Sequence, residues 1–268
     1  MTSSTSSVLM KSVSETRPIT GSPNLLPIEA VVMVGGYGNR LRAVSNNLPK
    51  TLLPVGDRPL LELVLHQLRE AGIRRVYLAT HYKAELFAQR YGNGEGVGLE
   101  IRYLREDQPL GTAGALSLLP KSEQPFLVMN GDILARVRFG DLWEFHQAHH
   151  ATMTIAVHQH AVTIPYGVVE TDGVRVVHLR EKPVMKHCIN AGIYLLSPQA
   201  LQVIPSNQRY DMTDLIGQLL ADGALVVSFP FQEQWWDIGD IENYRQAVRD
   251  FQTPLTRSER HDHDKAVD

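Results

Sequence analysis

Short apolar runs alternate with amphipathic segments along the first half of the chain. Runs typical of buried strands cover residues 28–34, 74–80, 99–104 and 125–132. Helical spacing is clearest where Leu60, Leu61, Val64, Leu65 and Leu68 fall on one face. Helices are expected at 59–72, 83–92 and 139–150, with the start of another at 113–120. This alternation predicts an α/β fold: a doubly wound, mostly parallel sheet with helices on both faces.

The pattern changes after residue 150 and predicts a small mixed lobe on the same sheet. Strands are expected at 151–159, 166–171, 174–180, 188–196 and 224–231, and helices at 197–204, 212–223 and 240–251. Asp172–Gly173 is predicted to be a tight turn, and Ser197 is expected to cap the helix that Pro198 begins. We expect one domain over 26–252, with halves at 26–150 and 151–252 and a cleft at the carboxyl ends of the parallel strands. The polar ends, 1–25 and 253–268, are predicted to be disordered.

Composition excludes several classes of protein. The 268 residues carry a net charge of −3, which gives no broad footprint for nucleic acid. The single cysteine, Cys188, excludes an internal disulfide and a cysteine-based zinc cluster and fits a reducing cytoplasm. No apolar run reaches the ~18 residues of a membrane span, and the start does not resemble a secretory signal. We therefore predict a cytoplasmic protein that binds neither nucleic acid nor membrane.

Two histidine clusters allow a metal interpretation. His146 and His150 lie four residues apart on an expected helix, and His158 and His160 share one face of an expected strand. No cysteine or carboxylate completes a tetrahedral set. The sequence favours a solvated, partly stacked group of histidines over a metal site.

Three glycines follow the first expected strand, in the sequence VGGYGNRL at 34–41. Gly35, Gly36 and Gly38 allow the backbone to approach a ligand and to direct N–H groups at an anion, although a tight turn explains them equally well. The spacing matches neither the dinucleotide fingerprint nor the P-loop. Arg40 adds a planar fork of donors and Lys50 adds a point charge. Together with the glycines they predict a clamp for a polyphosphate.

The motif continues as GGYGNRLRAVSNNLPKTLLPVGDRPLLE, and EDQPLGTAGAL, VMNGD, PYGVVE, EKP, NAGIY and WWDIGD follow it in order. This ordered set, over about residues 28 to 250, resembles the sugar-phosphate nucleotidylyltransferases, and PLGTAGAL resembles their mannose-1-phosphate guanylyltransferase members. The resemblance implies a Rossmann-like fold with a nucleotide-binding half at 26–150 and a sugar-binding half at 151–252. It also implies an enzyme that joins a sugar 1-phosphate, or a sugar-like cyclitol 1-phosphate, to a nucleoside triphosphate with release of pyrophosphate.

The resemblance also assigns roles to individual residues. Arg40 would stabilise the leaving pyrophosphate, Lys50 the reacting phosphates and Lys182 the phosphate of the sugar. Asp132 and Asp237 would hold Mg²⁺, as carboxylates commonly do. The remaining expected contacts are Gly35, Gly36, Gly38, Glu106, Pro109, Gly111 and Thr112 to the nucleotide, and Gly167, Glu181, Asn190 and Gly192 to the sugar.

Glu106 bears on the choice of base. An ionised carboxylate only accepts hydrogen bonds, and guanine offers two adjacent donors where uracil and thymine offer one. The sequence therefore favours GTP, with UTP or dTTP as the alternatives. Departures from the family pattern, Val34, Asn39, Ala43 and Ser45, would reshape the nucleotide pocket while keeping its charges.

Two other functions compete with a nucleotidylyltransferase. A catalytically silent subunit that binds nucleotide sugars for regulation would have lost Arg40, Lys50, Asp132 or Asp237, and all four are present. A glycosyltransferase would normally show an Asp-x-Asp motif after a strand, whereas this chain has a single Asp in VMNGD. The sequence does not fix the oligomeric state and leaves a homo-oligomer open.

Overall fold

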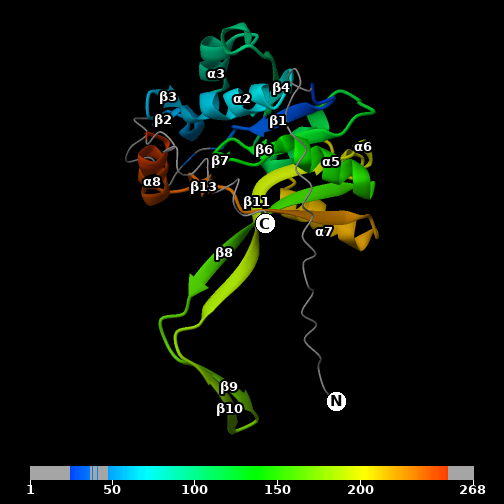
Figure 1. Cartoon of the computed structure of the whole chain (residues 1–268). Helices are drawn as coiled ribbons and strands as arrows, with labels where there is room; N and C mark the ends of the chain where they lie inside the picture. Colours follow the sequence, from blue (N-terminus) through cyan, green and yellow to red (C-terminus); the bar gives the residue numbers. More distant parts are fainter. Residues whose placement is uncertain (1–24, 37, 39–40, 42–47, 253–268) are drawn as a thin grey trace, which may run out of the picture.

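The computed structural model describes residues 25–36, 38, 41 and 48–252. Its centre is a seven-stranded sheet in the order β12-β8-β11-β6-β1-β4-β5 (Figure 1). The strands are β1 (Glu29–Met33), β4 (Arg75–Thr80), β5 (Glu100–Arg105), β6 (Phe126–Asn130), β8 (Met153–Thr163), β11 (Val184–Leu196) and β12 (Val226–Phe231). Only β11 runs antiparallel to its neighbours in this sheet. The predicted mostly parallel α/β sheet is confirmed.

Alternate residues of strand β1 pack into two separate apolar cores, one on each face of the sheet. Ala30 and Val32 of β1 join one apolar cluster with helices α2 (Leu60–Glu70), α3 (Ala84–Tyr91), α5 (Phe139–His149) and α8 (Ile241–Gln252). Val31 joins the other with helices α4 (Gly111–Gly114), α6 (Pro198–Leu201) and α7 (Met212–Ala221). Because both faces of β1 are covered, the strand is a continuous apolar run without polar alternation. Within the described residues, no helix combines the length and the apolar character that crossing a membrane requires.

The smaller elements complete the body of the molecule. Two-stranded sheets pair β2 (Pro54–Val55) with β3 (Arg58–Pro59) and β7 (Ile133–Ala135) with β13 (Trp235–Asp237), and 3₁₀ turns are η2 (Lys50–Leu52), η3 (Glu95–Val97) and η4 (Ala115–Leu118). The helix expected from residue 113 is therefore the short α4 followed by η4. Ser197 begins α6, but the expected side-chain cap is wrong because its hydroxyl donates to the Ala151 carbonyl instead.

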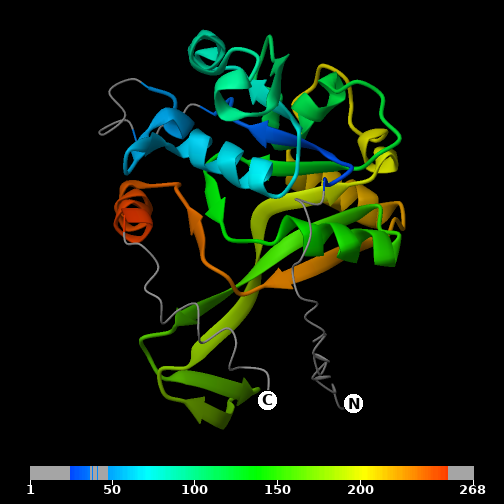
Figure 2. The same ribbon diagram turned by 45° about the horizontal axis from the view of Figure 1, so that its top comes forward.

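One part of the chain stands away from the body. The outer halves of β8 and β11 leave the sheet as a two-stranded ribbon, which carries the hairpin of β9 (Val168–Asp172) and β10 (Arg175–Arg180) at its end (Figures 1 and 2). We call residues 157–190 the arm. β8 is parallel to β1 and β6, so the arm leaves the sheet at the edge where the carboxyl ends of those strands lie. The turn expected at Asp172–Gly173 joins β9 to β10.

The two predicted disordered ends lie almost wholly outside the described residues. They cover 1–25 and 253–268, and the description begins at Leu25 and ends at Gln252. The division into halves at residue 150 stays a prediction, because β6 of the first half pairs directly with β11 of the second in one continuous sheet.

Candidate active site

A pocket of about 210 Å³ lies at the edge of the sheet where β1 and β6 end. Its lining residues come from four segments that are distant in sequence: Met33, Val34, Gly36, Gly38, Lys50, Thr51, Asp132 and Gly239. In open α/β sheets, ligands bind outside the carboxyl ends of the strands. The pocket occupies that position, and it contains two of the glycines, one cation and one carboxylate that the sequence singled out.

The three glycines meet different surroundings. A side chain at Gly36 would meet open space, whereas a Cβ at Gly38 would lie 2.8 Å from the Cβ of Lys50. Gly38 also has φ of +61°, a conformation that other residues adopt at a cost. Gly38 thus allows Lys50 to approach the backbone closely, and Gly36 borders open space. Arg40, with the departures at Asn39, Ala43 and Ser45, lies outside the described residues.

Lys50 and Asp132 form an ion pair at the pocket, although 82 positions separate them. The Lys50 Nζ atom lies 2.5 Å from Asp132 Oδ2, and the two side chains are 11% and 30% exposed. Gly131 positions the aspartate: its N–H donates to the Met33 carbonyl at 2.9 Å, and a Cβ there would lie 2.8 Å from the same oxygen. The close approach of β1 to this turn therefore requires glycine before Asp132.

The second predicted carboxylate, Asp237, is on a strand beside Asp132. Asp237 pairs with Ile133 across β13 and β7, and the Ile238 N–H donates to the Asp132 carbonyl at 3.0 Å. Among the described residues, no group of three or more His, Cys, Asp or Glu side chains is arranged to hold a metal. Mg²⁺ at nucleotide sites typically uses one or two carboxylates and takes its other ligands from water and substrate phosphates. Two neighbouring aspartates fit that mode and do not fit a metal site built from protein ligands alone.

Sequence reasoning missed Thr51 and Gly239. Thr51 lines the pocket and is 5% exposed, and its Oγ1 is buried with no hydrogen-bond partner among the described residues. A buried hydroxyl without a partner is costly, so Thr51 Oγ1 is suited to meet a ligand. Both residues directly extend motifs that the sequence had shown: Thr51 follows Lys50, and Gly239 lies two residues after Asp237.

Glu106 lies beside the first glycine of the loop. A Cβ at Gly35 would lie 3.0 Å from Glu106 Oε1, and Glu106 Oε2 accepts the N–H of Leu110 at 2.8 Å. Burial raises the pKa of the Glu106 carboxyl, although the hydrogen bond from Leu110 opposes this shift. The Leu110 bond uses one lone pair, and the carboxylate keeps acceptor sites on both oxygens. The structure therefore puts an acceptor next to the glycine loop.

Comparisons with known proteins agree with this geometry. Residues 29–253 match the family model described as nucleotidyl transferase. The chain belongs to the nucleotidyl transferase family. The resemblance found in the sequence motifs is thereby confirmed at the level of the family.

Two of the similar proteins are named as mannose-1-phosphate guanylyltransferases. The chain is 34% identical over 238 residues to "Mannose-1-phosphate guanylyltransferase catalytic subunit beta" of Danio rerio, a match over 83% of this chain and 66% of that protein. It is 32% identical over 231 residues to "Mannose-1-phosphate guanylyltransferase" of Mycobacterium tuberculosis, over 83% of this chain and 64% of that one. The chain thus spans somewhat less than two thirds of the length of these relatives.

Solved structures share the fold of this nucleotidyl transferase chain. HddC from Yersinia pseudotuberculosis superposes with a TM-score of 0.67 at 24% identity, covering 84% of this chain and 99% of that one. A putative glucose-1-phosphate thymidylyltransferase from Bacillus anthracis gives 0.69 at 21% identity, covering 85% and 97%. At such identities the likeness concerns the fold alone.

Two residues expected at the base of the nucleotide have structural partners in this member of the family. Gly111 has φ of +80°, and a Cβ there would lie 2.5 Å from Asp211 Oδ1. The Thr112 N–H donates to the same Asp211 oxygen at 3.1 Å, and Thr112 Oγ1 accepts the Met212 N–H at 2.8 Å. These contacts dock α4 on the start of α7. Pro109 lies exposed in the loop before them, and its predicted contact to the nucleotide stays a prediction.

The residues predicted to contact the sugar fall into two groups. Asn190 and Gly192 lie at the root of the arm, where Asn190 Oδ1 accepts the Gly192 N–H at 3.0 Å. Gly192 has φ of +73°, and a Cβ there would lie 2.8 Å from Asn130 Nδ2. Asn130 is two residues from Asp132, so these two predicted contacts are close to the pocket.

The second group lies on the arm. Gly167 directly precedes β9, and Glu181 and Lys182 directly follow β10. A Cβ at Gly167 would lie 3.1 Å from Glu181 Oε2, and Lys182 Nζ lies 4.0 Å from Glu181 Oε1. The Glu181 and Lys182 side chains are 71% and 65% exposed. The structure brings these three residues together with one another, but it does not bring them to the pocket that holds Lys50 and Asp132.

His146 differs from the solvated histidine that the sequence favoured. It is 2% exposed, with Nδ1 at 2.8 Å from Thr154 Oγ1 and Nε2 at 3.0 Å from Ser197 Oγ. Because Ser197 donates its only proton to Ala151, His146 must donate from Nε2 and accept at Nδ1. Burial lowers the pKa of His146 to about 4. The expectation of a solvated side chain is therefore wrong at this position, where the helical turn buries the imidazole between β8 and Ser197.

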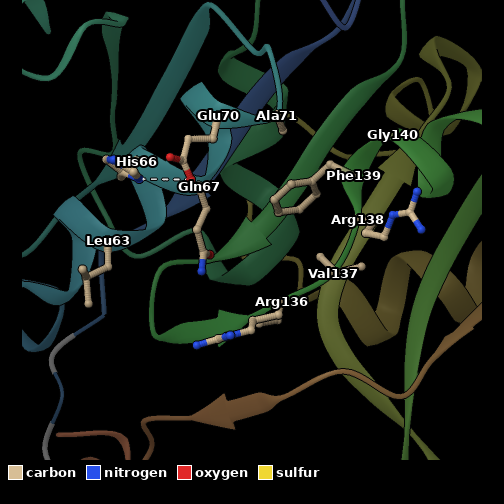
Figure 3. A pocket seen from close by; sticks show the side chains of 11 residues that line it. Leu63, His66, Gln67, Glu70, Ala71, Arg136, Val137, Arg138, Phe139 and Gly140 are labelled. Carbon is tan, nitrogen blue, oxygen red and sulfur yellow. Dashed lines mark ion pairs between the residues drawn. The ribbon is translucent and has the colours of Figure 1, made fainter. Parts of the chain in front are cut away.

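A larger hollow, of about 520 Å³, lies away from these residues between α2 and the segment after β7 (Figure 3). Its polar side chains are His66, Gln67, Glu70, Arg136 and Arg138. His66 Nδ1 lies 3.3 Å from Glu70 Oε2, which is the pair drawn in Figure 3. None of the predicted site residues lines this hollow, so size alone does not identify the reactive site.

Proposed function

We propose that this protein is a sugar-1-phosphate nucleotidylyltransferase that favours GTP and makes a nucleotide-activated sugar or sugar-like cyclitol. The observation that carries the proposal is the ion pair of Lys50 and Asp132 in a pocket formed by glycines at the end of β1. A phosphoryl-transfer site needs positioning and neutralisation of charge more than covalent chemistry. A flexible backbone, a cation and a carboxylate in one pocket meet that need.

The proposed reaction is an in-line displacement at phosphorus. An oxygen of the sugar 1-phosphate attacks the α-phosphorus of the triphosphate, and the bond from that phosphorus to the bridging oxygen of the β-phosphate breaks. The electron pair leaves with the pyrophosphate, so atoms and charge balance without an oxidant or reductant. Lys50 would then bind the reacting phosphates, Arg40 the leaving pyrophosphate and Lys182 the phosphate of the sugar, because cations stabilise the charge that spreads over these oxygens.

Asp132 and Asp237 would hold Mg²⁺, whose contribution when bound is to neutralise the phosphates and align attacking and leaving oxygens. In the structure, Lys50 forms an ion pair with the Asp132 carboxylate. Binding of a divalent ion and a triphosphate would let Lys50 exchange the aspartate for a phosphate oxygen. The ion pair thus holds together, before substrate binds, the cation and the carboxylate that the proposed reaction uses.

Two observations support GTP over UTP or dTTP. Glu106 presents carboxylate acceptors beside Gly35, and guanine is the base with two adjacent donors. Relatives at 31–34% identity are named mannose-1-phosphate guanylyltransferases, and the Yersinia pseudotuberculosis HddC structure is also described in complex with GMP-PN. A neighbour described as a thymidylyltransferase and another as a UDP-glucose pyrophosphorylase keep UTP and dTTP as the alternatives. A cytoplasmic location stays a prediction that rests on the single cysteine.

The decisive experiment is a matrix of substrates with Mg²⁺. Each of GTP, UTP, dTTP, CTP and ATP is paired with a panel of sugar and cyclitol 1-phosphates, and released pyrophosphate is measured. We expect turnover with GTP and at least one 1-phosphate, and loss of turnover when the metal is chelated. If no pair reacts while the protein still binds nucleotide sugars, the silent regulatory subunit replaces this proposal.

Glu106→Gln tests the preference for GTP. Glutamine keeps the shape but offers one acceptor oxygen and an amide donor where guanine needs two acceptors. We expect kcat/KM for GTP to fall by about 10- to 100-fold, as for loss of a hydrogen bond to a charged group, with UTP use nearly unchanged. Asp107→Asn is the matched control on the same loop, where the side chain is exposed. An unchanged preference would remove Glu106 as the reader of the base.

A further inference from the structure

The arm carries a lysine and a glutamate that do not line the pocket of Lys50 and Asp132 in the same copy. Gly167, Glu181 and Lys182 gather at the junction between the ribbon and the β9–β10 hairpin, which both views show standing away from the seven-stranded sheet (Figures 1 and 2). Lys182 also adopts φ of +44°, in the left-handed region that residues other than glycine rarely occupy. Such strain is concentrated at functional sites. The lysine is therefore held in a special conformation, and within the described part of the chain it does not line the pocket that holds Lys50 and Asp132.

The arm is held in its outward direction by regular structure. From Val184 opposite Thr163 to Asn190 opposite Val157, the β8–β11 ladder is unbroken. Its only irregularity lies between Asn190 and Tyr194, at the point where β11 enters the sheet.

The root of the arm is braced by the body on two sides. Gly192 packs on Asn130, and the Trp235 indole donates to the Ala191 carbonyl at 3.0 Å. The same indole stacks on His158 of β8 at 5.7 Å between ring centroids. Bending the arm back at its root would break these contacts, whereas an arm that points outward leaves them intact.

The hairpin at the tip has one apolar and one polar face. Val169 pairs with Leu179 and Thr171 with Val176 on one face, where the three apolar side chains are 51–61% exposed. Glu170, His178 and Arg180 lie on the other, and Arg180 donates to Glu170. A lone two-stranded sheet is marginal in water unless its apolar face is packed. Among the described residues this hairpin belongs to a sheet of two strands only, so its apolar face has no second layer.

We infer that the arm is exchanged between two copies of this chain, so that Lys182 and Glu181 of one copy complete the pocket formed by Lys50 and Asp132 of the other. A two-fold arrangement makes the exchange reciprocal, because the same arm and the same pocket are used twice. The exchange covers the apolar face of the hairpin with a second copy. It also leaves the contacts of Trp235 and Gly192 at the root of the arm unbroken. A standard interface engages about 20–30 residues on each partner, which residues 157–190 can supply. This inference rests on the proposed function for the roles of the residues, but the association of two copies does not.

The first experiment measures mass in solution and is independent of activity. Light scattering should give twice the 30.0 kDa of the chain. The variant Val169→Ser/Leu179→Ser, on the apolar face, should be monomeric at the same concentration while its circular dichroism spectrum shows that the body is still folded. His178→Ser, on the polar face of the same hairpin, is the control and should stay dimeric. A monomeric wild-type protein, or a double variant that remains dimeric, overturns the assignment of this surface to a second copy.

The second experiment asks which copy supplies Lys182. Asp132→Asn and Lys182→Ala chains are coexpressed with different tags and purified through both, so that every dimer is mixed. With exchanged arms, one of the two sites combines an intact pocket with an intact arm, and about half of the wild-type activity is expected at low sugar 1-phosphate. If each arm serves its own pocket, both sites are damaged and activity stays at the background of the separate variants, which overturns the proposal.

The reciprocal pair gives the opposite result and serves as the matched control. A dimer of wild-type and Asp132→Asn/Lys182→Ala chains should be at background if arms are exchanged and at about half of wild type if they are not. If the wild-type protein turns over no substrate pair, the proposed function fails, and the mass measurements alone decide whether the arm joins two copies.

Discussion

The pocket around Asp132 and the arm around Lys182 are built in opposite ways, although each begins as a short charged motif in the sequence. Asp132 follows a glycine that packs against β1, and its carboxylate is already paired with Lys50 at 2.5 Å. Lys182 is 65% exposed and its ion pair with Glu181 is 4.0 Å long. Exposed pairs of this length contribute about 0–1 kcal/mol. The charges proposed to act on the phosphates are therefore already paired and partly buried, whereas those proposed for the sugar are exposed and weakly paired.

The contrast extends to the surrounding side chains. Residues at the inner end of β11, from Ala191, are buried, whereas most of the outer part of the strand is exposed. One strand thus belongs to a rigid core at one end and to an open surface at the other. Electrostatic catalysis benefits from the preorganisation that a core provides. Recognition of different sugars needs a surface that can change without loss of the core.

Loss of the carboxylate at the pocket should have the largest effect. Asp132→Asn keeps the shape and removes the charge that holds Lys50 and the proposed Mg²⁺, so turnover should fall on the order of a thousandfold. Initial rates of pyrophosphate release measure this. Asp222→Asn, an exposed aspartate at the end of α7, is the matched control and should keep the wild-type rate. Retained turnover in Asp132→Asn would contradict the assignment of this pocket.

The next largest difference between the two regions should be in how much a truncated apolar side chain lowers the free energy of unfolding. Leu65 of α2 is fully buried, and Leu65→Ala should lower the free energy of unfolding by about 2–5 kcal/mol because it leaves a cavity. Val174, at the turn between β9 and β10, is fully exposed, and Val174→Ala should change it by about 0.5 kcal/mol or less. Urea unfolding of both variants measures the difference. Equal losses would mean that the tip of the arm is packed as tightly as the core.

Acid should destabilise the body through His146. The unfolded chain takes up a proton near the ordinary pKa of 6.5, whereas the folded chain binds it only near a pKa of about 4. Stability is therefore complete above pH 6.5 and falls as the pH decreases toward 4, by up to about 3 kcal/mol. Urea unfolding from pH 7 to pH 4 should show this fall and a shallower one in His146→Gln. The arm variant His178→Gln is the control; a profile in His146→Gln as steep as in wild type would show that another group is responsible.

The arm lysine should give the smallest of these effects, and it should concern one substrate only. Lys182→Ala removes the charge-assisted contact that we propose to the phosphate of the sugar, and such a contact is worth about 1.5–3 kcal/mol. We expect kcat/KM for the sugar 1-phosphate to fall by about 10- to 100-fold, while KM for the triphosphate is unchanged. Arg175→Ala, an exposed cation on the same hairpin, should behave as wild type. A parallel change in KM for the triphosphate would place Lys182 in the nucleotide site instead.

The sequence predicted the elements well wherever periodicity reflects burial. The apolar run at 28–34 is β1, and the leucine face at 59–72 is α2 with all five named residues buried. The same reasoning missed His146, because nothing in a local pattern shows that Thr154 and Ser197 will surround its ring. Local patterns report which face is buried, but hydrogen-bond partners are set by distant segments.

The site was predictable in its residue types and less so in its arrangement. Motifs identified Lys50 and Asp132, and the structure joins them across 82 positions. Thr51 carried no signal beyond its place directly after Lys50 in the motif. Nor does any spacing show that Gly111 meets Asp211, or that EKP ends on an arm. These relations depend on where whole strands are directed, which residue types alone do not encode.

The antiparallel strand β11 limits how the length of the arm can vary among relatives. β11 runs unbroken from the arm into the centre of the sheet beside β6, and side chains along a strand alternate between faces. Inserting a single residue would turn every following side chain to the opposite face, either on the arm or in the core. Insertions and deletions here should therefore come in even steps, as at the irregularity after Asn190, where the register of the β8–β11 ladder already shifts by two residues between Asn190↔Val157 and Tyr194↔Ile155.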